Sequence, residues 1–203
     1  FKLNIKPIPG LTYQQVLGYE NRQWENHTYN PSTARDEIEN SRKGTAYLGF
    51  SKTENLTSEG YFTYLKEFNG GHNINATAGY SYFETNGEGF NMTNYNFSVD
   101  GIKYWDMNQG SYLSDGKAAM SSSKNITEKL FSVFARVNYS YNDKYMASAS
   151  IRHEGSSKFA ADNRWANFWS VTAGWRISNE DFMKDVSWVN DLKVRFGYGV
   201  TGN

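Results

Sequence analysis

Residues 131–152, FSVFARVNYSYNDKYMASASIR, decide the fold of this chain. The odd positions are apolar or aromatic (Phe131, Val133, Ala135, Val137, Tyr139, Tyr141), whereas the even ones are mostly polar (Ser132, Phe134, Arg136, Asn138, Ser140). After Asn142, Asp143 and Lys144 the same alternation resumes and runs to Arg152. A period of two residues is that of a β-strand, so the stretch predicts a hairpin with one apolar and one polar face. Such a hairpin suits a wall between lipid and water.

The composition is compatible with a membrane barrel although the mean hydropathy, −0.72, is low. No run of about 18 apolar residues is present, which excludes a transmembrane helix. Barrel strands need only about 9 to 11 residues each, and only every second residue has to be apolar. Aromatic residues make up 17% of the chain. They fit interfacial girdles, and they equally fit the β-propensity of aromatic residues in the strands of a soluble sandwich.

Several functional classes are disfavoured. The 21 basic and 21 acidic residues cancel, so no broad basic surface indicates nucleic acid. The absence of cysteine excludes a disulfide framework and a cysteine-ligated zinc site. Asp106, Asn108 and Gly110 match only half of a calcium loop, and the three histidines are scattered. His153 and Glu154 are neighbours on one strand and point to opposite faces, which disfavours a hydrolase. We therefore expect that the chain is not an enzyme and binds no metal or cofactor.

The spacing of turn residues predicts an antiparallel up-and-down sheet. Strands are expected near residues 1–6, 11–19, 58–68, 72–84, 130–142, 145–154, 165–177 and 191–200. Short turns at 7–10, 69–71 and 142–144 fall at one end. Long loops at about 20–57 and 85–129, with a shorter one at 155–164, fall at the other. This is the layout of outer-membrane barrels, with turns in the periplasm and loops outside the cell.

Two connections carry further expectations. Segment 43–52 is expected to form an extra strand within its loop. On the short side, residues 178–190 are expected to form a small helix, because Ser178 can cap it and Ile177 and Phe182 can form a hydrophobic staple. The chain starts with Phe1 and stops just after a strand, so we expect it to be a piece of a longer protein.

A family resemblance rests on five motifs that occur in the expected order. They are RVNYSY at 136–141, GSSKF at 155–159, NRW at 163–165, GWRISNE at 174–180 and YGVTGN at 198–203. Over residues 130–203 the chain resembles the barrel of the SusC/RagA family of TonB-linked outer-membrane proteins. Upstream the resemblance depends on the KPIPGL hairpin and the strands around the Phe68–His72 turn. Trp169 stands where the family usually has proline, and Arg152–Gly155 replaces a tract that is often RDGSS.

The resemblance implies a barrel of about 22 strands closed by an N-terminal plug, of which residues 1–203 supply about eight strands. The plug and the TonB box are absent from this sequence. Related proteins sit in the outer membrane, bind a SusD-like surface lipoprotein, and import glycans or peptides with energy passed through TonB. The chain would contribute lipid-facing wall and extracellular loops, without catalysis, cofactors or nucleic-acid binding.

Candidate contact residues are aromatic or basic. Aromatic rings expected in the loops can pack against sugars or peptides. They are Trp24, Tyr29, Tyr95, Phe97, Tyr104, Trp105 and Tyr112. The alternative is that they stiffen the loops or touch the lipoprotein. Arginines on the polar faces of strands are expected to line the lumen or pair with the plug. They are Arg136, Arg152, Arg176 and Arg195.

Three alternatives make different structural predictions. A complete eight-stranded barrel, acting as an adhesin or scaffold, requires hydrogen bonds between residues 1–6 and 191–200, whereas a segment leaves two open edges. A soluble sandwich requires Trp165, Trp169 and Trp175 to be buried against a second sheet. A hydrolase requires a Ser/His/acid cluster within hydrogen-bond distance.

Overall fold

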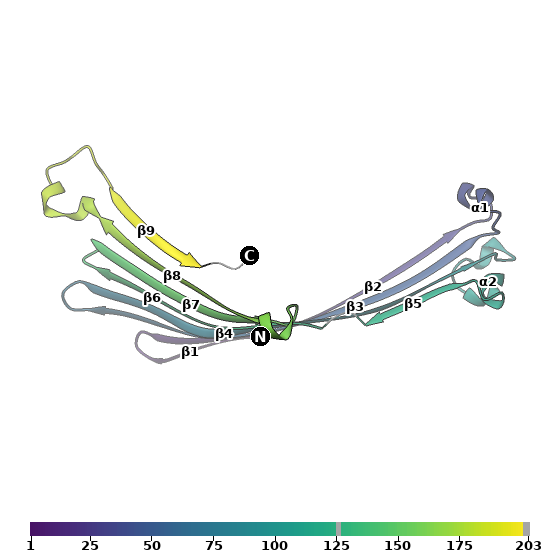
Figure 1. Ribbon diagram of the computed structural model, residues 1–203, viewed down its shortest axis with the longest axis horizontal. Helices are drawn as coiled ribbons and strands as arrows, with labels where there is room; N and C mark the ends of the chain where they lie inside the picture. The colour runs from purple at the N-terminus through teal and green to yellow at the C-terminus, as the bar shows by residue number, and fades with distance from the viewer. Residues whose placement is uncertain (125–126, 201–203) are drawn as a thin grey trace. The chain divides into compact units, whose positions relative to one another are not determined.

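The structure is a computed structural model that describes residues 1–124 and 127–200. It is all-β and antiparallel, as predicted (Figure 1). The strands are β1 (Lys2–Ile8), β2 (Leu11–Asn30), β3 (Thr45–Phe68), β4 (His72–Tyr95), β5 (Ala119–Lys124), β6 (Glu128–Tyr141), β7 (Tyr145–Ser156), β8 (Trp165–Arg176) and β9 (Lys193–Val200). Two short helices, α1 (Arg35–Glu39) and α2 (Ser111–Ser114), lie in connections. In the described ranges no helix is long and apolar enough to span a membrane.

The sheet is a meander with two free edges. Its strand order is β1-β2-β3-β4-β6-β7-β8-β9, and β5 pairs with β4 off this path. Within the described residues β1 and β9 stand at opposite ends of this order and do not pair with each other. This contradicts the complete eight-stranded barrel and agrees with a segment of a larger one.

The chain divides into two compact units. Unit 1 contains residues 1–19, 56–84 and 128–203, and unit 2 contains residues 20–55 and 85–127. Strands β2, β3 and β4 contribute residues to both.

The long loops predicted from the sequence are shorter in the structure, because strands of unit 2 extend into them. Among the described residues, strands occupy much of the segments 20–57 and 85–129, and the longer connections are 31–44 and 96–118. Residues 43–52 belong largely to β3 and do not form a separate strand. These parts carry polar residues on both faces, and strand pairing still satisfies their backbone groups.

The tight turn between β6 and β7 has the predicted chemistry. Asn142 and Asp143 both have positive φ angles, 49° and 53°, and Lys144 N donates to Tyr141 O at 2.9 Å. Two consecutive positive φ values define the type I′ turn, whose twist matches that of the flanking strands. The register from Tyr141↔Tyr145 to Leu130↔Ser156 is unbroken.

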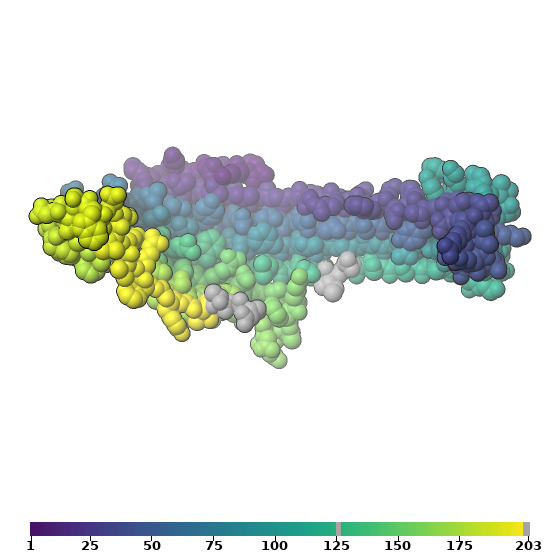
Figure 2. Space-filling model, turned by 90° about the horizontal axis from the view of Figure 1, so that it is seen from above, coloured from purple at the N-terminus to yellow at the C-terminus, as the bar shows by residue number. Residues whose placement is uncertain are grey.

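The helix predicted between β8 and β9 is wrong. Two 3-10 turns, η4 (Ile177–Asn179) and η5 (Asp181–Met183), take its place in a compact knob at one end of unit 1 (yellow-green in Figure 2). Glu180 separates them with an extended backbone, φ −79° and ψ 150°. Ser178 does not cap the turn, and its hydroxyl donates to Asp191 at 3.0 Å.

The sheet has almost no hydrophobic core. Among hydrophobic residues of the described chain, Ala46 and Phe97 are the buried ones, and both belong to unit 2. In the described part of unit 1 the large apolar side chains are exposed or half-buried, and Trp165, Trp169 and Trp175 are 40–50% exposed. The soluble sandwich is therefore wrong, because it requires these three rings to be buried.

Candidate functional site

Unit 1 is a wall with chemically different faces. The apolar face contains cross-strand rows such as Ala149–Val171–Tyr198 and Ile151–Trp169–Val200. The polar face contains hydroxyl pairs that bond to each other across the strands. They are Ser148–Thr172 at 2.6 Å, Ser150–Ser170 at 2.7 Å and Ser81–Ser132 at 2.7 Å. Polar groups are thus paired on one side, and the other side offers hydrocarbon to its surroundings.

Aromatic residues with polar tips mark both ends of the apolar face. At the end near the short turns, Trp175 Nε1 and the Tyr145 hydroxyl both donate to Glu180, at 3.0 and 2.6 Å. At the other end, the His153 and Trp165 rings stack 4.8 Å apart and nearly parallel. Rings with an apolar body and a polar tip favour the boundary between hydrocarbon and water.

Glu180 is the centre of a side-chain clasp at the turn end of unit 1. Besides the two aromatic donors, Lys144 Nζ lies 3.0 Å from its carboxylate. Hydrogen bonds from Tyr145, Trp175 and Lys144 lower the pKa of Glu180 to about 2. The same carboxylate raises the pKa of Lys144. The clasp joins the β6–β7 turn to the β8–β9 connection, and the sequence patterns do not identify it.

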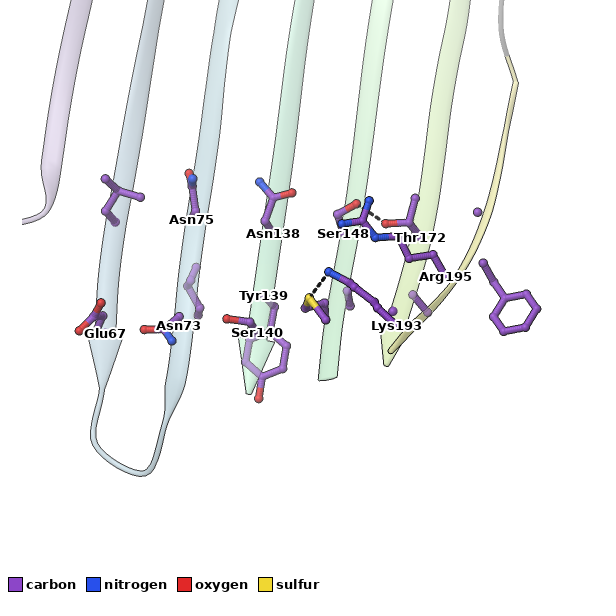
Figure 3. Close-up of a pocket in the computed structure, with 18 of the residues that line it drawn as sticks. Glu67, Asn73, Asn75, Asn138, Tyr139, Ser140, Ser148, Thr172, Lys193 and Arg195 are labelled. Carbon is purple, nitrogen blue, oxygen red and sulfur yellow. Dashed lines mark hydrogen bonds between the residues drawn. The ribbon is translucent and has the colours of Figure 1, made fainter. Parts of the chain in front are cut away.

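The polar face contains a hollow of about 780 Å³ lined by six strands, β3, β4 and β6 to β9 (Figure 3). The charged residues of its lining are Lys66, Glu67, Lys193 and Arg195, and the other labelled residues carry amides or hydroxyls. Lys193 Nζ lies 2.8 Å from Met146 Sδ. Glu67 and Lys193 were not among the predicted residues, although Lys193 lies two positions before Arg195 and so shares its face.

The four predicted arginines all lie on the polar face of unit 1. Arg152 pairs with Glu154 at 2.6 Å, and Arg176 lies 3.4 Å from Asp191. Arg136 stands opposite Ser150, and Arg195 stands opposite Gly174. The face is therefore basic over much of its height.

The predicted aromatic residues belong to unit 2 and form small groups. Tyr29 meets Phe97 edge-on, with centroids 5.7 Å apart. The other close ring pairs are Tyr95–Tyr112 at 5.2 Å and Tyr104–Trp105 at 4.8 Å. Trp24 and Trp105 are 68% and 76% exposed, whereas Phe97 is 2% exposed. Phe97 is therefore a packing residue, and we withdraw it from the ligand contacts.

Two carboxylates that the sequence did not single out organise the connections of unit 2. Asp100 accepts hydrogen bonds from Tyr29 Oη at 2.7 Å, Ser32 N at 2.9 Å and Ser32 Oγ at 2.8 Å. The Ser32 N–H, the Tyr29 hydroxyl and the Ser32 hydroxyl together lower the pKa of Asp100. Burial and the bond to Asp100 raise the pKa of Tyr29. Glu37 is fully buried, where Arg42 at 3.2 Å and the Thr45 hydroxyl at 2.7 Å compensate it.

No metal-binding cluster is found in the ranges that the structure describes, since no three His, Asp or Glu side chains gather closely enough. What these ranges offer is a two-faced wall, a basic hollow and a set of aromatic surface groups. This arrangement can separate lipid from water and bind molecules, and no catalytic group is assigned to it.

Comparison with known proteins shows which family the chain belongs to. A family model described as "TonB dependent receptor-like, beta-barrel" matches residues 3–203. The chain belongs to this family. TonB-dependent receptors P39 and P3 of Formosa agariphila are 32% and 34% identical to it over 99% and 97% of its length. TonB-dependent receptor SusC of Bacteroides thetaiotaomicron is 48% identical over 73 residues, which are 36% of this chain and 7% of SusC.

The fold agrees with that of a solved transporter. The structure of the RagAB peptide transporter matches 98% of this chain and 22% of the solved chain with a TM-score of 0.83 and 24% identity. This TonB-dependent receptor segment is thus SusC/RagA-like in both sequence and fold. The chain spans about a fifth of the length of these relatives, 19% of P39 and 19% of P3.

Proposed function

We propose that this chain forms part of the wall and the extracellular surface of an outer-membrane importer. The importer takes up glycan or oligopeptide nutrients, is driven through TonB, and works with a SusD-like surface lipoprotein. The chain binds and encloses the nutrient and performs no catalysis. The observation that carries the proposal is the inverted exposure of unit 1, where Val133, Ile151 and Val171 are 43–54% exposed and the polar face is the less exposed one.

The bilayer is the surrounding that makes this arrangement stable. Complete burial of an apolar side chain of this size away from water stabilises a fold by about 1.5 to 3 kcal/mol. The exposed half of each side chain would lack its share of this stabilisation in water. In the hydrocarbon region it loses nothing, and the paired strands satisfy the backbone groups that lipid cannot. The free edges of β1 and β9 then pair with further strands of the same barrel, because a barrel spans the membrane only when it is closed.

The polar face is the side that we assign to the lumen. Arg136, Arg152, Arg176 and Arg195 lie on it, and with Lys193 they form a basic surface. In the whole importer this surface faces the plug, which belongs to the N-terminal part of such receptors together with the TonB contact. Acidic groups of the plug would pair with the basic side chains.

The surface of unit 2 is the side that we assign to the nutrient and to the lipoprotein. Aromatic side chains with polar tips can bind ligands or partners. The candidate contacts are the exposed Trp24 and Trp105 and the half-buried Tyr29, Tyr95, Tyr104 and Tyr112. The RagAB structure is that of a peptide transporter, and this similarity keeps peptides among the candidate nutrients.

Spin labelling of the full-length receptor in bilayers tests the wall. Nitroxides at Val133, Ile151 and Val171 should collide freely with oxygen dissolved in the bilayer. Labels at Asn138 and Thr172, on the polar face, are the controls and should be shielded from it. Shielding of all three apolar-face labels would refute the lipid-facing wall and the importer with it.

Removal of the 98–109 connection tests the role of the surface. Phe97 and Gly110 pair across its base, so the deletion joins two adjacent residues. We expect cells carrying the shortened receptor to assemble the barrel normally and to take up less nutrient or to retain less lipoprotein. Failure of the barrel to assemble would show that this connection is structural.

A further inference from the structure

Unit 2 contains a shallow groove on one face of its strands, which we call the Trp24 groove. It measures about 330 Å³ and is lined by residues of β2, β3, β4 and β5. Trp24 and Asn26 come from β2, and Tyr47 comes from β3. Asn91 and Ser121 stand opposite each other in the β4–β5 register and complete the lining. This volume is near the lower end of small-ligand sites, about 300 to 1,000 Å³, so the groove holds one section of a longer molecule.

Two glycines keep the floor of the groove open. A Cβ on Gly49 would lie 2.6 Å from the Tyr47 hydroxyl and 2.9 Å from its ring. A Cβ on Gly89 would lie 2.8 Å from the carbonyl oxygen of Phe50. The hydroxyl end of Tyr47 therefore lies directly over Gly49, and a larger residue there would displace it.

The opposite face of these strands is already covered. On β2, His27 and Tyr29 alternate with Trp24 and Asn26, and so point to the other side. There Tyr29 contacts Phe97, and the His27 ring lies 5.1 Å from that of Tyr104. The 96–118 connection thus packs against this opposite face, and Trp24 on the groove face is 68% exposed.

The chemistry of the lining selects among ligand classes. None of the residues around the groove carries a charge, and its polar groups are the amides of Asn26 and Asn91 with the hydroxyls of Ser51, Ser121 and Ser123. Short peptides bring charged termini, which gain nothing from an uncharged groove. Extended peptides also bind by adding a strand to a sheet edge, whereas this floor is a sheet face whose backbone groups are paired within the strands.

Neutral sugars match every feature of the groove. A pyranose ring has an apolar face that packs on an aromatic plane, and its rim of hydroxyls bonds to amides and hydroxyls. Trp24, 68% exposed, and the half-buried Tyr47 supply two aromatic rings to the lining. We propose that the Trp24 groove binds a section of a neutral oligosaccharide. This inference rests on the proposed import function and selects glycans over peptides as the nutrient bound there.

Direct binding to the purified full-length receptor tests the inference separately from transport. The receptor in detergent is applied to an array of neutral and acidic glycans, and the affinity for the strongest neutral one is measured by calorimetry. We expect Trp24→Ala to weaken this affinity at least tenfold, and Trp24→Phe, which keeps an aromatic plane, to weaken it less than threefold. Trp188→Ala, which removes an 84% exposed tryptophan of unit 1, should change nothing.

Two outcomes would overturn the inference while leaving the importer intact. One is that the receptor binds none of the neutral glycans and still imports peptides. The other is that Trp24→Ala binds glycans as well as the parent does, and if this variant also binds less of the lipoprotein, the groove is a partner surface. A receptor that neither reaches the outer membrane nor imports any nutrient would instead refute the proposed function.

Discussion

For single residues, the position in the alternation decides the effect of a substitution. Val171 lies on the apolar face, and its neighbour Thr172 bonds to Ser148 on the polar face. We expect Val171→Arg to destabilise the barrel in lipid, lowering its free energy of unfolding by about 2 to 4 kcal/mol if the site is near the midplane. Thr172→Arg should have a much smaller effect. Denaturant titration of the full-length receptor in bilayers measures both, and equal losses would contradict the assignment of the faces.

Glu180 makes a prediction about acid sensitivity. Its pKa falls from 4.5 to about 2 because three donors stabilise the carboxylate. A carboxyl with a lowered pKa stabilises the folded state above pH 4.5, and this contribution is lost as the pH falls towards 2. Glu180→Gln should therefore lower stability at neutral pH and flatten the pH dependence between these values. Asp185→Asn, in the same connection but outside the clasp, is the control, and an unchanged pH profile in Glu180→Gln would contradict the role of the clasp.

Among the elements, two neighbouring turns at the short end are packed together. Asn142 N donates to Gly71 O at 2.8 Å, and a Cβ on Gly71 would lie 1.8 Å from Asn142 Oδ1. Gly71→Ala should thus destabilise the barrel by more than the roughly 1 kcal/mol expected from its positive φ. Gly70→Ala is a matched control, since Gly70 also has a positive φ and its added Cβ would meet His72 at an ordinary 3.6 Å. Thermal unfolding measures the difference, and equal losses would show that the two turns do not constrain each other.

Among the elements, sequence patterns predicted some strands well and others poorly. Strands in unit 1 were predicted closely, since apolar and polar residues alternate along them and Asn142–Asp143 fixes the register. The parts of β2, β3 and β4 that belong to unit 2 were not, because polar residues occur on both of their faces and leave no alternation to detect. The prediction of a helix at 178–190 was wrong for another reason. Its helical pattern is local, whereas Glu180 bonds to Lys144 and Tyr145, which are distant in sequence.

For the whole molecule, the free edges of β1 and β9 determine what the chain can do alone. An unpaired strand edge cannot remain in the hydrocarbon region, because its backbone groups have no partners there. We expect residues 1–203 expressed alone to aggregate or stay unfolded in detergent, whereas the full-length receptor gives a compact band that shifts on heating in gel electrophoresis. A heat-modifiable monomer of residues 1–203 would instead support a small closed barrel.

The sequence by itself determined that this chain is an antiparallel wall with an apolar and a polar face, because a two-residue period leaves no other arrangement for residues 131–152. Its motifs also placed it among SusC/RagA-like barrels before any geometry was known. Only the tertiary structure decided which groups meet across strands. The Glu180 clasp, the Asp100 bonds, the burial of Phe97 and the uncharged Trp24 groove all join residues from separate segments. Such contacts depend on strand register and on the paths of the connections, which local patterns of side chains do not encode.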